Sequence, residues 1–179
     1  MRILLALLVS SLLSAPSLTA QAGGSGSARP EAAAADVHSL DAIIGALYDV
    51  ISGPAGPRDW DRFRSLFKDG ARLIPTFGQD GNIGMRVSTP EEYAERAGPY
   101  FSNNGFFERE IGRTVEEYGQ LVHAFSAYDS RRTAEGEPFV RGINSIQLLN
   151  DGTRWWVVSI MWADVTTAGE IPARYLRGH

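Results

Sequence analysis

The chain contains no cysteine, a single lysine and no apolar run long enough to span a membrane. Without cysteine no disulfide can form, and lipid attachment of the lipoprotein type is excluded as well. The lysine is Lys68, so arginine carries nearly all the positive charge. The Walker pattern, the dinucleotide-binding glycine fingerprint and the Gly-x-Ser-x-Gly nucleophile motif are also missing. The sequence therefore lacks the common signatures of phosphate binding, dinucleotide binding and serine hydrolysis.

The N-terminus has the features of a secretory signal peptide. Arg2 precedes an apolar stretch from Ile3 to Val9, and Ala20-Gln21-Ala22 forms a small-x-small cleavage site. Serines and Pro16 interrupt the apolar run well short of the roughly 20 residues that a retained anchor needs. We therefore predict a signal peptide over residues 1–22 and a periplasmic or secreted protein without a membrane anchor after cleavage.

One domain is expected after a short linker. Residues 23–35, GGSGSARPEAAAA, are of low complexity and predict a disordered linker. Residues 36–179 suit a single domain, because chains of this size bury about 70% of their unfolded surface, and residues 166–179 are expected to pack back across it as a tail. The chain has 17 Lys plus Arg against 21 Asp plus Glu, and this balance disfavours nucleic-acid binding.

Three helices are predicted in the first half of the domain. Apolar residues recur at helical spacing over residues 40–51, after Asp36 or Ser39 as a cap. A shorter helix with aromatic residues on one side follows Asp59 and leads into a strand over residues 71–75. Residues 76–87 are glycine-rich and predict a loop or an irregular hairpin. A capping box over Thr89-Pro90-Glu91-Glu92 begins the third helix.

The second half of the domain has β character in four runs, residues 106–118, 121–130, 139–149 and 154–165. A two-residue turn at Gly119-Gln120 pairs Glu116 with His123, Arg113 with Ser126, and Ile111 with Tyr128. Helices followed by antiparallel strands predict an α+β domain with the helices on one side of a sheet.

The last two runs flank Asp151-Gly152, a pair suited to a tight type I′ turn. With these two residues at the centre of the turn, Ile146 faces Val157 and Asn144 faces Ser159 on one face of the hairpin. On the other face, Arg141 lies opposite Trp162. Both faces mix apolar and polar groups, which favours a curved sheet with a partly polar cavity on one side and a second contact surface on the other.

The order of these elements resembles the nuclear transport factor 2-like superfamily, in particular its SnoaL-like branch. The resemblance rests on the helix ending at Tyr48, on PRDWDRFRSLFKDGARLIP over residues 57–75, and on the closing pair GINSIQLL and RWWVVSIMW. It implies a cone-shaped α+β barrel, in which three N-terminal helices pack on a strongly bent antiparallel sheet and close a conical pocket. It also implies a homodimer through the outer sheet face, and chemistry without a cofactor or metal.

Ligand-binding and partner residues follow from the resemblance. The side chains expected to line the pocket are Tyr48, Trp60, Phe63, Tyr128, Asn144, Trp155, Ser159 and Met161. The outer face would present Arg141, Trp156 and Trp162 to the second subunit, where aromatic and arginine side chains are common. Alternatively, Arg141 and Trp162 make a cation–π contact within one chain.

Tyr48 and His123 are the candidate catalytic residues. Tyr48 lies late on the first helix, where a ketosteroid isomerase of this superfamily has its oxyanion-binding tyrosine, but Arg72-Leu73-Ile74 stands where the isomerase has its base. Tyr48 is therefore either a pocket or core residue or an oxyanion donor. His123 opposite Glu116 is either a general base or half of an ion pair on the outer face. No histidine and acid spacing suits a metal.

One more catalytic arrangement remains open. An epoxide hydrolase of this superfamily uses an Asp-Arg-Asp relay, and Asp129, Arg141 and Asp164 lie near strand ends. The leading hypothesis is an exported protein that binds a small, largely apolar molecule. One alternative is a cofactor-independent isomerase, dehydratase or hydrolase. The other is a dimeric interaction module in which the expected pocket is merely part of the hydrophobic core.

Overall fold

The computed structural model of the chain describes residues 29–79 and 82–176. The predicted signal peptide, residues 1–22, and the predicted linker up to residue 28 lie outside those residues. The end of the predicted linker is helical, because Ala34 and Ala35 belong to the first helix. Within the described ranges, no helix is both long and apolar enough to cross a membrane.

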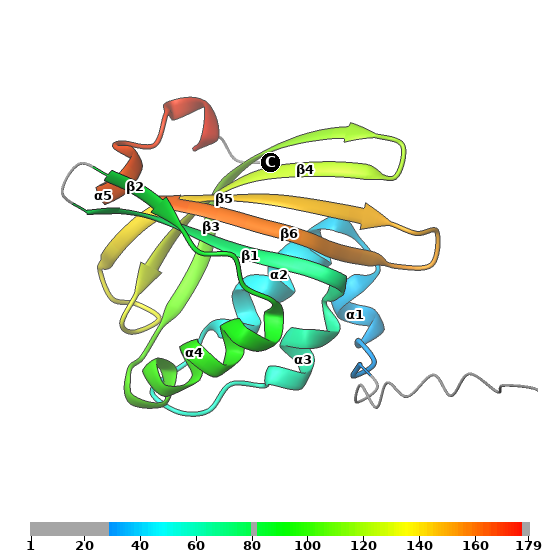
Figure 1. Cartoon of the computed structure of the whole chain (residues 1–179), viewed down its shortest axis with the longest axis horizontal. Helices are drawn as coiled ribbons and strands as arrows, with labels where there is room; N and C mark the ends of the chain where they lie inside the picture. The colour runs from blue at the N-terminus through cyan, green and yellow to red at the C-terminus, as the bar shows by residue number, and fades with distance from the viewer. Residues whose placement is uncertain (1–28, 80–81, 177–179) are drawn as a thin grey trace, which may run out of the picture.

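A strongly bent sheet of six strands forms one layer, in the order β2-β1-β6-β5-β4-β3 (Figure 1). Neighbouring strands run antiparallel except β1 and β6, which are parallel. The predicted α+β class is confirmed, and the parallel pair is the exception to the expected antiparallel sheet. The strands are β1 (Phe67–Gln79), β2 (Asn82–Met85), β3 (Phe107–Tyr118), β4 (Leu121–Arg131), β5 (Pro138–Asn150) and β6 (Trp155–Asp164).

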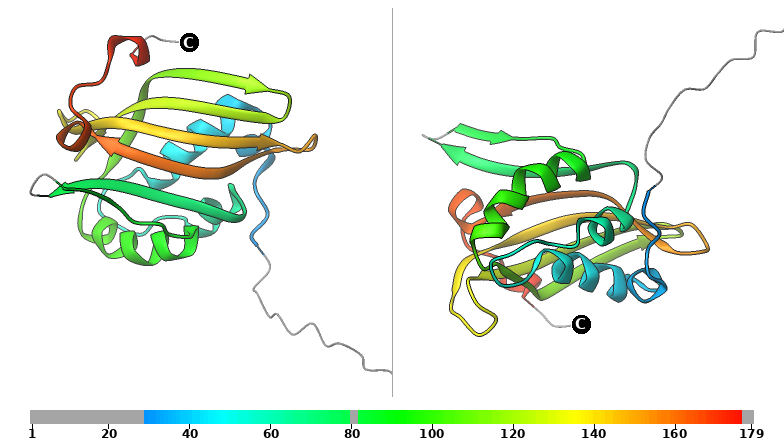
Figure 2. Two further views of the ribbon diagram at one scale, coloured as in Figure 1. Left: turned by 45° about the horizontal axis from the view of Figure 1, so that its top comes forward. Right: turned by 90° about the horizontal axis from the view of Figure 1, so that it is seen from below.

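The helices before β3 cover one face of this sheet, as the views in Figures 1 and 2 show together. They are α1 (Ala34–Val37), α2 (Leu40–Ile51), α3 (Trp60–Ser65) and α4 (Pro90–Asn103). Ser39 caps α2 by accepting a hydrogen bond from the backbone of Ala42, and Asp59 caps α3 in the same way. At α4 the predicted capping box between Thr89 and Glu92 is present.

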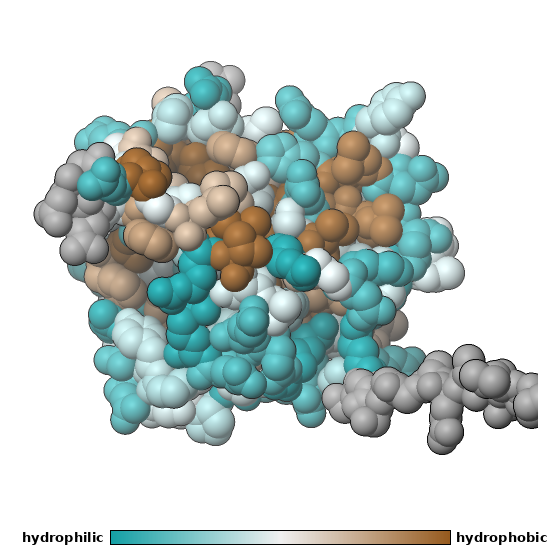
Figure 3. Space-filling view, viewed as in Figure 1, coloured by the Kyte–Doolittle hydropathy of each residue, from teal (hydrophilic) through white to brown (hydrophobic). Residues whose placement is uncertain are grey.

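The core lies between these helices and the concave face of the sheet. Ile43 and Ile44 of α2 are almost fully buried against Ile146, Leu148 and other residues of the sheet. Burying an aliphatic side chain of this size stabilises the fold by about 1.5–3 kcal/mol. Apolar residues are also exposed on the strands: Figure 3 shows brown patches over the sheet, whereas the helical part below it is mostly hydrophilic. The exposed apolar side chains include Phe77, Ile83, Met85, Val158 and Met161.

The β3–β4 hairpin has the predicted turn at Gly119 and Gln120, since Tyr118 pairs with Leu121. The predicted pairs of Glu116 with His123 and of Arg113 with Ser126 are confirmed. The third pair is wrong by one residue, because a bulge between Glu110 and Gly112 places Glu110 opposite Tyr128.

The predicted register of the β5–β6 hairpin is wrong. Asn150 pairs with Trp155, so the connection spans residues 151–154 and is longer than a two-residue turn. The Asp151 carboxylate accepts hydrogen bonds from the backbone of Thr153 and of Arg154, which favours this longer turn. A bulge then shifts the pairing, because Leu148 lies opposite Val157 but Gln147 lies opposite Ser159. The longer turn moves the pairing by two residues and keeps the predicted faces, whereas the bulge reverses them for the second half of β6.

The described part of the predicted tail, up to residue 176, contacts the sheet. It contains α5 (Val165–Ala168) and the short 3-10 helix η1 (Ala173–Tyr175). The Tyr175 ring lies 5.1 Å from the ring of Phe125 on β4. This contact places η1 on the sheet face opposite α2, α3 and α4 (Figure 2).

Candidate functional site

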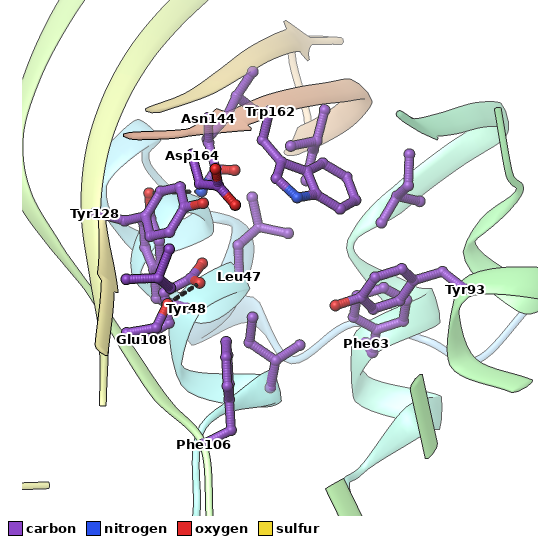
Figure 4. Close-up of a pocket in the computed structure, with 16 residues that line it drawn as sticks. Leu47, Tyr48, Phe63, Tyr93, Phe106, Glu108, Tyr128, Asn144, Trp162 and Asp164 are labelled. Carbon is purple, nitrogen blue, oxygen red and sulfur yellow. Dashed lines mark hydrogen bonds between the residues drawn. The ribbon is translucent and has the colours of Figure 1, made fainter. Parts of the chain in front are cut away.

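A cavity of about 250 Å³ lies between the helices and the concave face of the sheet. Its lining comes from α2, α3, α4 and every strand except β2, so residues far apart in the sequence meet there. Figure 4 shows these side chains from inside the fold. The lining residues are Leu47, Tyr48, Ile51, Phe63, Leu73, Tyr93, Phe106, Glu108, Tyr128, Ser130, Val140, Asn144, Ile146, Ile160, Trp162 and Asp164.

One side of the cavity is aromatic and aliphatic. The rings of Phe63 and Tyr93 stack with their centroids 5.5 Å apart, and Trp162 meets Tyr93 edge-on at 6.2 Å. These ring pairs stabilise each other by about 0.5–1.5 kcal/mol beyond the burial of their area. They therefore form a preformed wall.

The opposite side is polar. In Figure 4, Tyr48, Glu108, Tyr128, Asn144 and Asp164 gather across the cavity from Phe63 and Tyr93. A cavity with one apolar side and a few convergent polar groups is the usual form of a site for a small organic molecule.

Glu108, on β3, is the titratable group of this wall whose pKa is shifted into the neutral range. The Ser130 hydroxyl donates a hydrogen bond of 2.8 Å to its Oε2 atom, and the Asn144 side chain also bonds to the carboxyl group. Burial, and to a smaller extent the charge of Asp129, raises the pKa of Glu108 to about 7. The residue keeps some accessible surface, because it lines the cavity and a neighbouring hollow. Near neutral pH this carboxyl group can therefore both accept and donate a proton.

The Tyr48 hydroxyl belongs to a hydrogen-bonded chain that leads away from the cavity. It lies 2.6 Å from the Ser126 Oγ atom, and Ser126 donates its own proton to Glu110 over 2.5 Å. Tyr48 must then donate to Ser126, and its oxygen accepts from Asn144 at 3.1 Å. Burial, and next the charge of Glu108, raises the pKa of the Tyr48 phenol. Because its proton is engaged with Ser126, this arrangement favours Tyr48 as a pocket-lining residue over an oxyanion donor.

Two further polar groups complete the wall. Burial, with a smaller effect of Glu108, raises the pKa of the Tyr128 phenol, which keeps this ring neutral. Asp164 ends β6 and caps α5, since its Oδ1 atom accepts hydrogen bonds from the backbone of Thr166 and Thr167. Figure 4 shows its carboxyl group beside Tyr128.

Of the predicted pocket residues, Tyr48, Phe63, Tyr128 and Asn144 line the cavity. Trp60 lies behind it, with its ring edge-on to Phe63 at 5.4 Å.

Three residues predicted from β6 do not line the cavity. Trp155 lies at the start of the strand against the core, Ser159 donates a hydrogen bond to Gln147, and Met161 lines a hollow on the outer face. Trp162, predicted to face outward, lines the cavity, and it pairs with Asn144 instead of Arg141. The four-residue turn and the bulge in β6 account for these corrections.

His123 does not reach the cavity. Its Nε2 atom lies 2.8 Å from the Ser145 hydroxyl, and its ring meets the edge of Phe125 at 5.3 Å. Phe125 and Ser145 line the hollow on the outer face, so the structure places His123 on that face.

The hypothetical Asp-Arg-Asp relay is not assembled. Asp129 accepts hydrogen bonds from Arg131 at 2.8 Å and from Arg109 at 3.2 Å. Arg141 is exposed, and Asp164 alone of the three residues lines the cavity. Within the described residues, no group of histidine and acidic side chains could hold a metal ion.

Sequence reasoning missed Glu108, Phe106 and the inward position of Trp162. Glu108 stands in a highly charged stretch, FEREIGR, that looks like an exposed strand. Continuing the predicted β3–β4 pairing beyond Ile111 would have misplaced it by one residue, because the bulge near that residue changes the alternation of the strand. The sequence carries no signal for this bulge that we can identify.

No family model matches the sequence, and no curated protein is significantly similar to it. Solved structures with some similarity include an NTF2-like protein of unknown function from Silicibacter pomeroyi, with 11% identity, 71% of this chain and 93% of the other covered, and a TM-score of 0.47. A candidate ketosteroid isomerase from Shewanella frigidimarina has 11% identity, coverages of 68% and 91%, and a TM-score of 0.46. A protein from Kribbella flavida has 13% identity, coverages of 68% and 85%, and a TM-score of 0.49. At these values neither family membership nor function follows from the similarity, and the fold class rests on the elements described above.

Proposed function

We propose that this protein binds a small, largely apolar molecule in the cavity beneath the helices. The observation that carries the proposal is a cavity of about 250 Å³ with aromatic and aliphatic side chains on one side and Glu108, Tyr128 and Asn144 on the other. A cavity of about 150 Å³ accommodates benzene. The site therefore suits a molecule somewhat larger than one ring, with a single polar end.

The proposal includes the location and ancestry of the protein. Export to the periplasm or the medium is supported by the N-terminal residue pattern, with its apolar stretch and Ala20-Gln21-Ala22. Descent from the SnoaL-like branch of the nuclear transport factor 2-like superfamily is supported by the motifs that resemble it and by helices packed on a bent sheet.

A thermal-shift screen tests the binding proposal. We expect one-ring alcohols, ketones or amines to raise the midpoint of thermal unfolding, because a ligand that binds only the native state stabilises it. Val140→Trp, which places a larger side chain at the cavity wall, should abolish the shift. Leu121→Trp, at an exposed site beside the β3–β4 turn, serves as the matched control. Shifts of equal size in both variants would locate binding elsewhere.

The raised pKa of Glu108 favours a second candidate function, cofactor-independent proton transfer by an isomerase, dehydratase or hydrolase. A carboxyl group that titrates near pH 7 acts as either acid or base at physiological pH. Once a turnover assay exists, Glu108→Gln should lower kcat by about 10²–10⁴-fold. His123→Ala should leave kcat unchanged, because His123 lies on the outer face. The reverse pattern would contradict this assignment.

A further inference from the structure

The cavity contains acidic groups and no basic ones. Glu108 and Asp164 both line it, whereas none of its described lining residues is Arg, Lys or His. Two carboxyl groups in one small cavity disfavour an anionic ligand, since like charges repel strongly where water is excluded.

Glu108 differs in this respect from its neighbour Asp129. Asp129 is almost fully buried, and Arg109 and Arg131 neutralise its charge. Glu108 lies on the same pair of strands, yet its hydrogen-bond donors are the uncharged side chains of Ser130 and Asn144. Among the described residues, it forms no ion pair. A buried carboxylate without a partner of opposite charge is costly, and a bound cation would remove that cost.

Aromatic rings surround the rest of the cavity. Phe63, Tyr93, Phe106, Tyr128 and Trp162 all line it, and Figure 4 shows them on several sides of the open space. The faces of such rings attract organic cations, most strongly where the cation has lost its water, and tryptophan is the best of them.

From these observations we infer that the ligand is a small organic cation, such as a protonated alicyclic amine or a quaternary ammonium compound. The inference rests on the proposed function and names the class of ligand for the same cavity. The charged head would lie between the Glu108 carboxylate and the aromatic rings. The apolar body would pack on aliphatic residues such as Leu47, Ile146 and Ile160.

The charged and titratable groups near Glu108 come from several elements. Tyr48 from α2, Tyr93 from α4, Tyr128 from β4 and Asp164 from β6 line the cavity with it. Arg109, Glu110 and Arg131 line a neighbouring hollow that Glu108 shares, and Asp129 acts on it from β4.

The charge of Glu108 is the one that we expect to change near neutral pH. Burial raises the pKa of all three phenols, and hydrogen bonds from Arg131, followed by those from Arg109, hold the pKa of Asp129 below its usual range. Glu108, with a pKa of about 7, gains its negative charge between pH 6 and pH 8. Affinity for a cation should rise over the same range.

Three ligands of one shape test the inference by titration calorimetry: cyclohexylmethylamine, cyclohexylmethanol and cyclohexanecarboxylate. At pH 8 the amine should bind about tenfold more tightly than the alcohol, and the carboxylate should bind most weakly. The preference for the amine should fall between pH 8 and pH 6. The amine stays protonated throughout, because alkylamines titrate near pH 10.

Glu108→Gln should remove the roughly tenfold preference for the amine over the alcohol, because only the amine loses an opposite charge. Glu117→Gln, at an exposed position on the same strand, is the matched control and should change neither. The pH dependence of the wild-type protein provides the same test if the Glu108 variant fails to fold. Equal affinity for the amine and the alcohol would overturn the inference and leave the proposed function intact. Binding of none of the three ligands would count against both.

Discussion

Glu108 and Asp129 lie on adjacent strands, yet only Asp129 has neighbouring side chains that neutralise its charge. Arginine side chains neutralise Asp129, whereas burial keeps Glu108 in equilibrium between its two protonation states near neutral pH. Uncompensated buried ionisable groups cluster at functional sites, because they cost stability that selection for stability alone would remove. At the scale of single residues, Glu108 is the strongest indication that the cavity has a function.

The raised pKa of Glu108 predicts a loss of stability as the pH rises. The native protein retains a proton on Glu108 up to a pKa of about 7, whereas the unfolded chain loses it near 4.5, the ordinary pKa of glutamate. The native state therefore binds more protons between these values, and the free energy of unfolding falls through this range.

Glu108→Gln should remove that dependence, so the wild-type protein should lose on the order of 3 kcal/mol relative to the variant between pH 5 and pH 8. Urea denaturation across this range measures the difference, with Glu117→Gln as the control. A constant difference between wild type and Glu108→Gln would mean that Glu108 has an ordinary pKa.

Tyr48→Phe tests the hydrogen-bonded chain behind the cavity. The variant loses the bond to Ser126 and removes the acceptor for one Asn144 proton, so it should lower the free energy of unfolding by about 1–2 kcal/mol. Ligand affinity should change less than stability, because the Tyr48 proton does not face the cavity. A large loss of affinity without a loss of stability would restore the Tyr48 hydroxyl as a hydrogen-bond donor to the ligand. Equilibrium denaturation and calorimetry on the same sample separate the two outcomes.

Residue-scale expectations from the sequence were partly right, for identifiable reasons. Tyr48 and Phe63 lie on helices whose apolar spacing defines the buried face, so their place beside the cavity could be expected. Glu108 could not, because its position depends on a bulge in β3. Ser159 and Met161 were misplaced because a bulge in β6 exchanges the two faces of that strand.

At the scale of elements, local capping chemistry made the helices predictable. Ser39, Asp59 and Thr89 cap α2, α3 and α4 as the sequence indicates. Register was predictable only where a tight turn fixed it. The Gly119-Gln120 turn gives the first pairs of β3 and β4 correctly, whereas Asp151 uses its side chain to stabilise a longer turn than Asp-Gly pairs usually form.

The capping box of α4 should contribute measurably to stability. Thr89 accepts a hydrogen bond from the Glu92 backbone, and the Glu92 side chain accepts one from the Thr89 backbone. Thr89→Ala should lower the free energy of unfolding by about 1 kcal/mol. Since α4 carries Tyr93 to the cavity, ligand affinity should fall modestly as well. Thr114→Ala, at an exposed position on β3, is the control in urea denaturation, and an equal effect of both changes would refute the capping contribution.

At the scale of the whole molecule, the predicted homodimer through the outer sheet face remains a prediction. Two of the residues proposed for this interface are less suitable than expected. Trp162 lies in the cavity, and the ring of Trp156 packs against Arg154 of its own chain at 3.6 Å. Exposed apolar side chains on the same face, Val158 and Met161, are better candidates for a subunit contact.

Met161→Arg should convert such a dimer to a monomer, because it places a charge at an apolar interface. The mass in solution, measured by light scattering, gives the result directly. Leu121→Arg, at an exposed position beside the β3–β4 turn, is the control. A dimeric Met161→Arg variant would place the interface elsewhere, and a monomeric wild-type protein would contradict the homodimer.

At the scale of the whole molecule, the central claim is that the cavity is a binding site and not a packing defect. Native mass spectrometry tests this claim most directly. The protein would be purified gently from its own host and sprayed intact, and any released small molecule would be identified, in parallel with Val140→Trp. We expect the wild-type protein to retain a compound of about one ring that is absent from Val140→Trp, and we expect this compound to carry an amine. An empty wild-type protein that also binds none of the one-ring alcohols, ketones and amines would contradict the account.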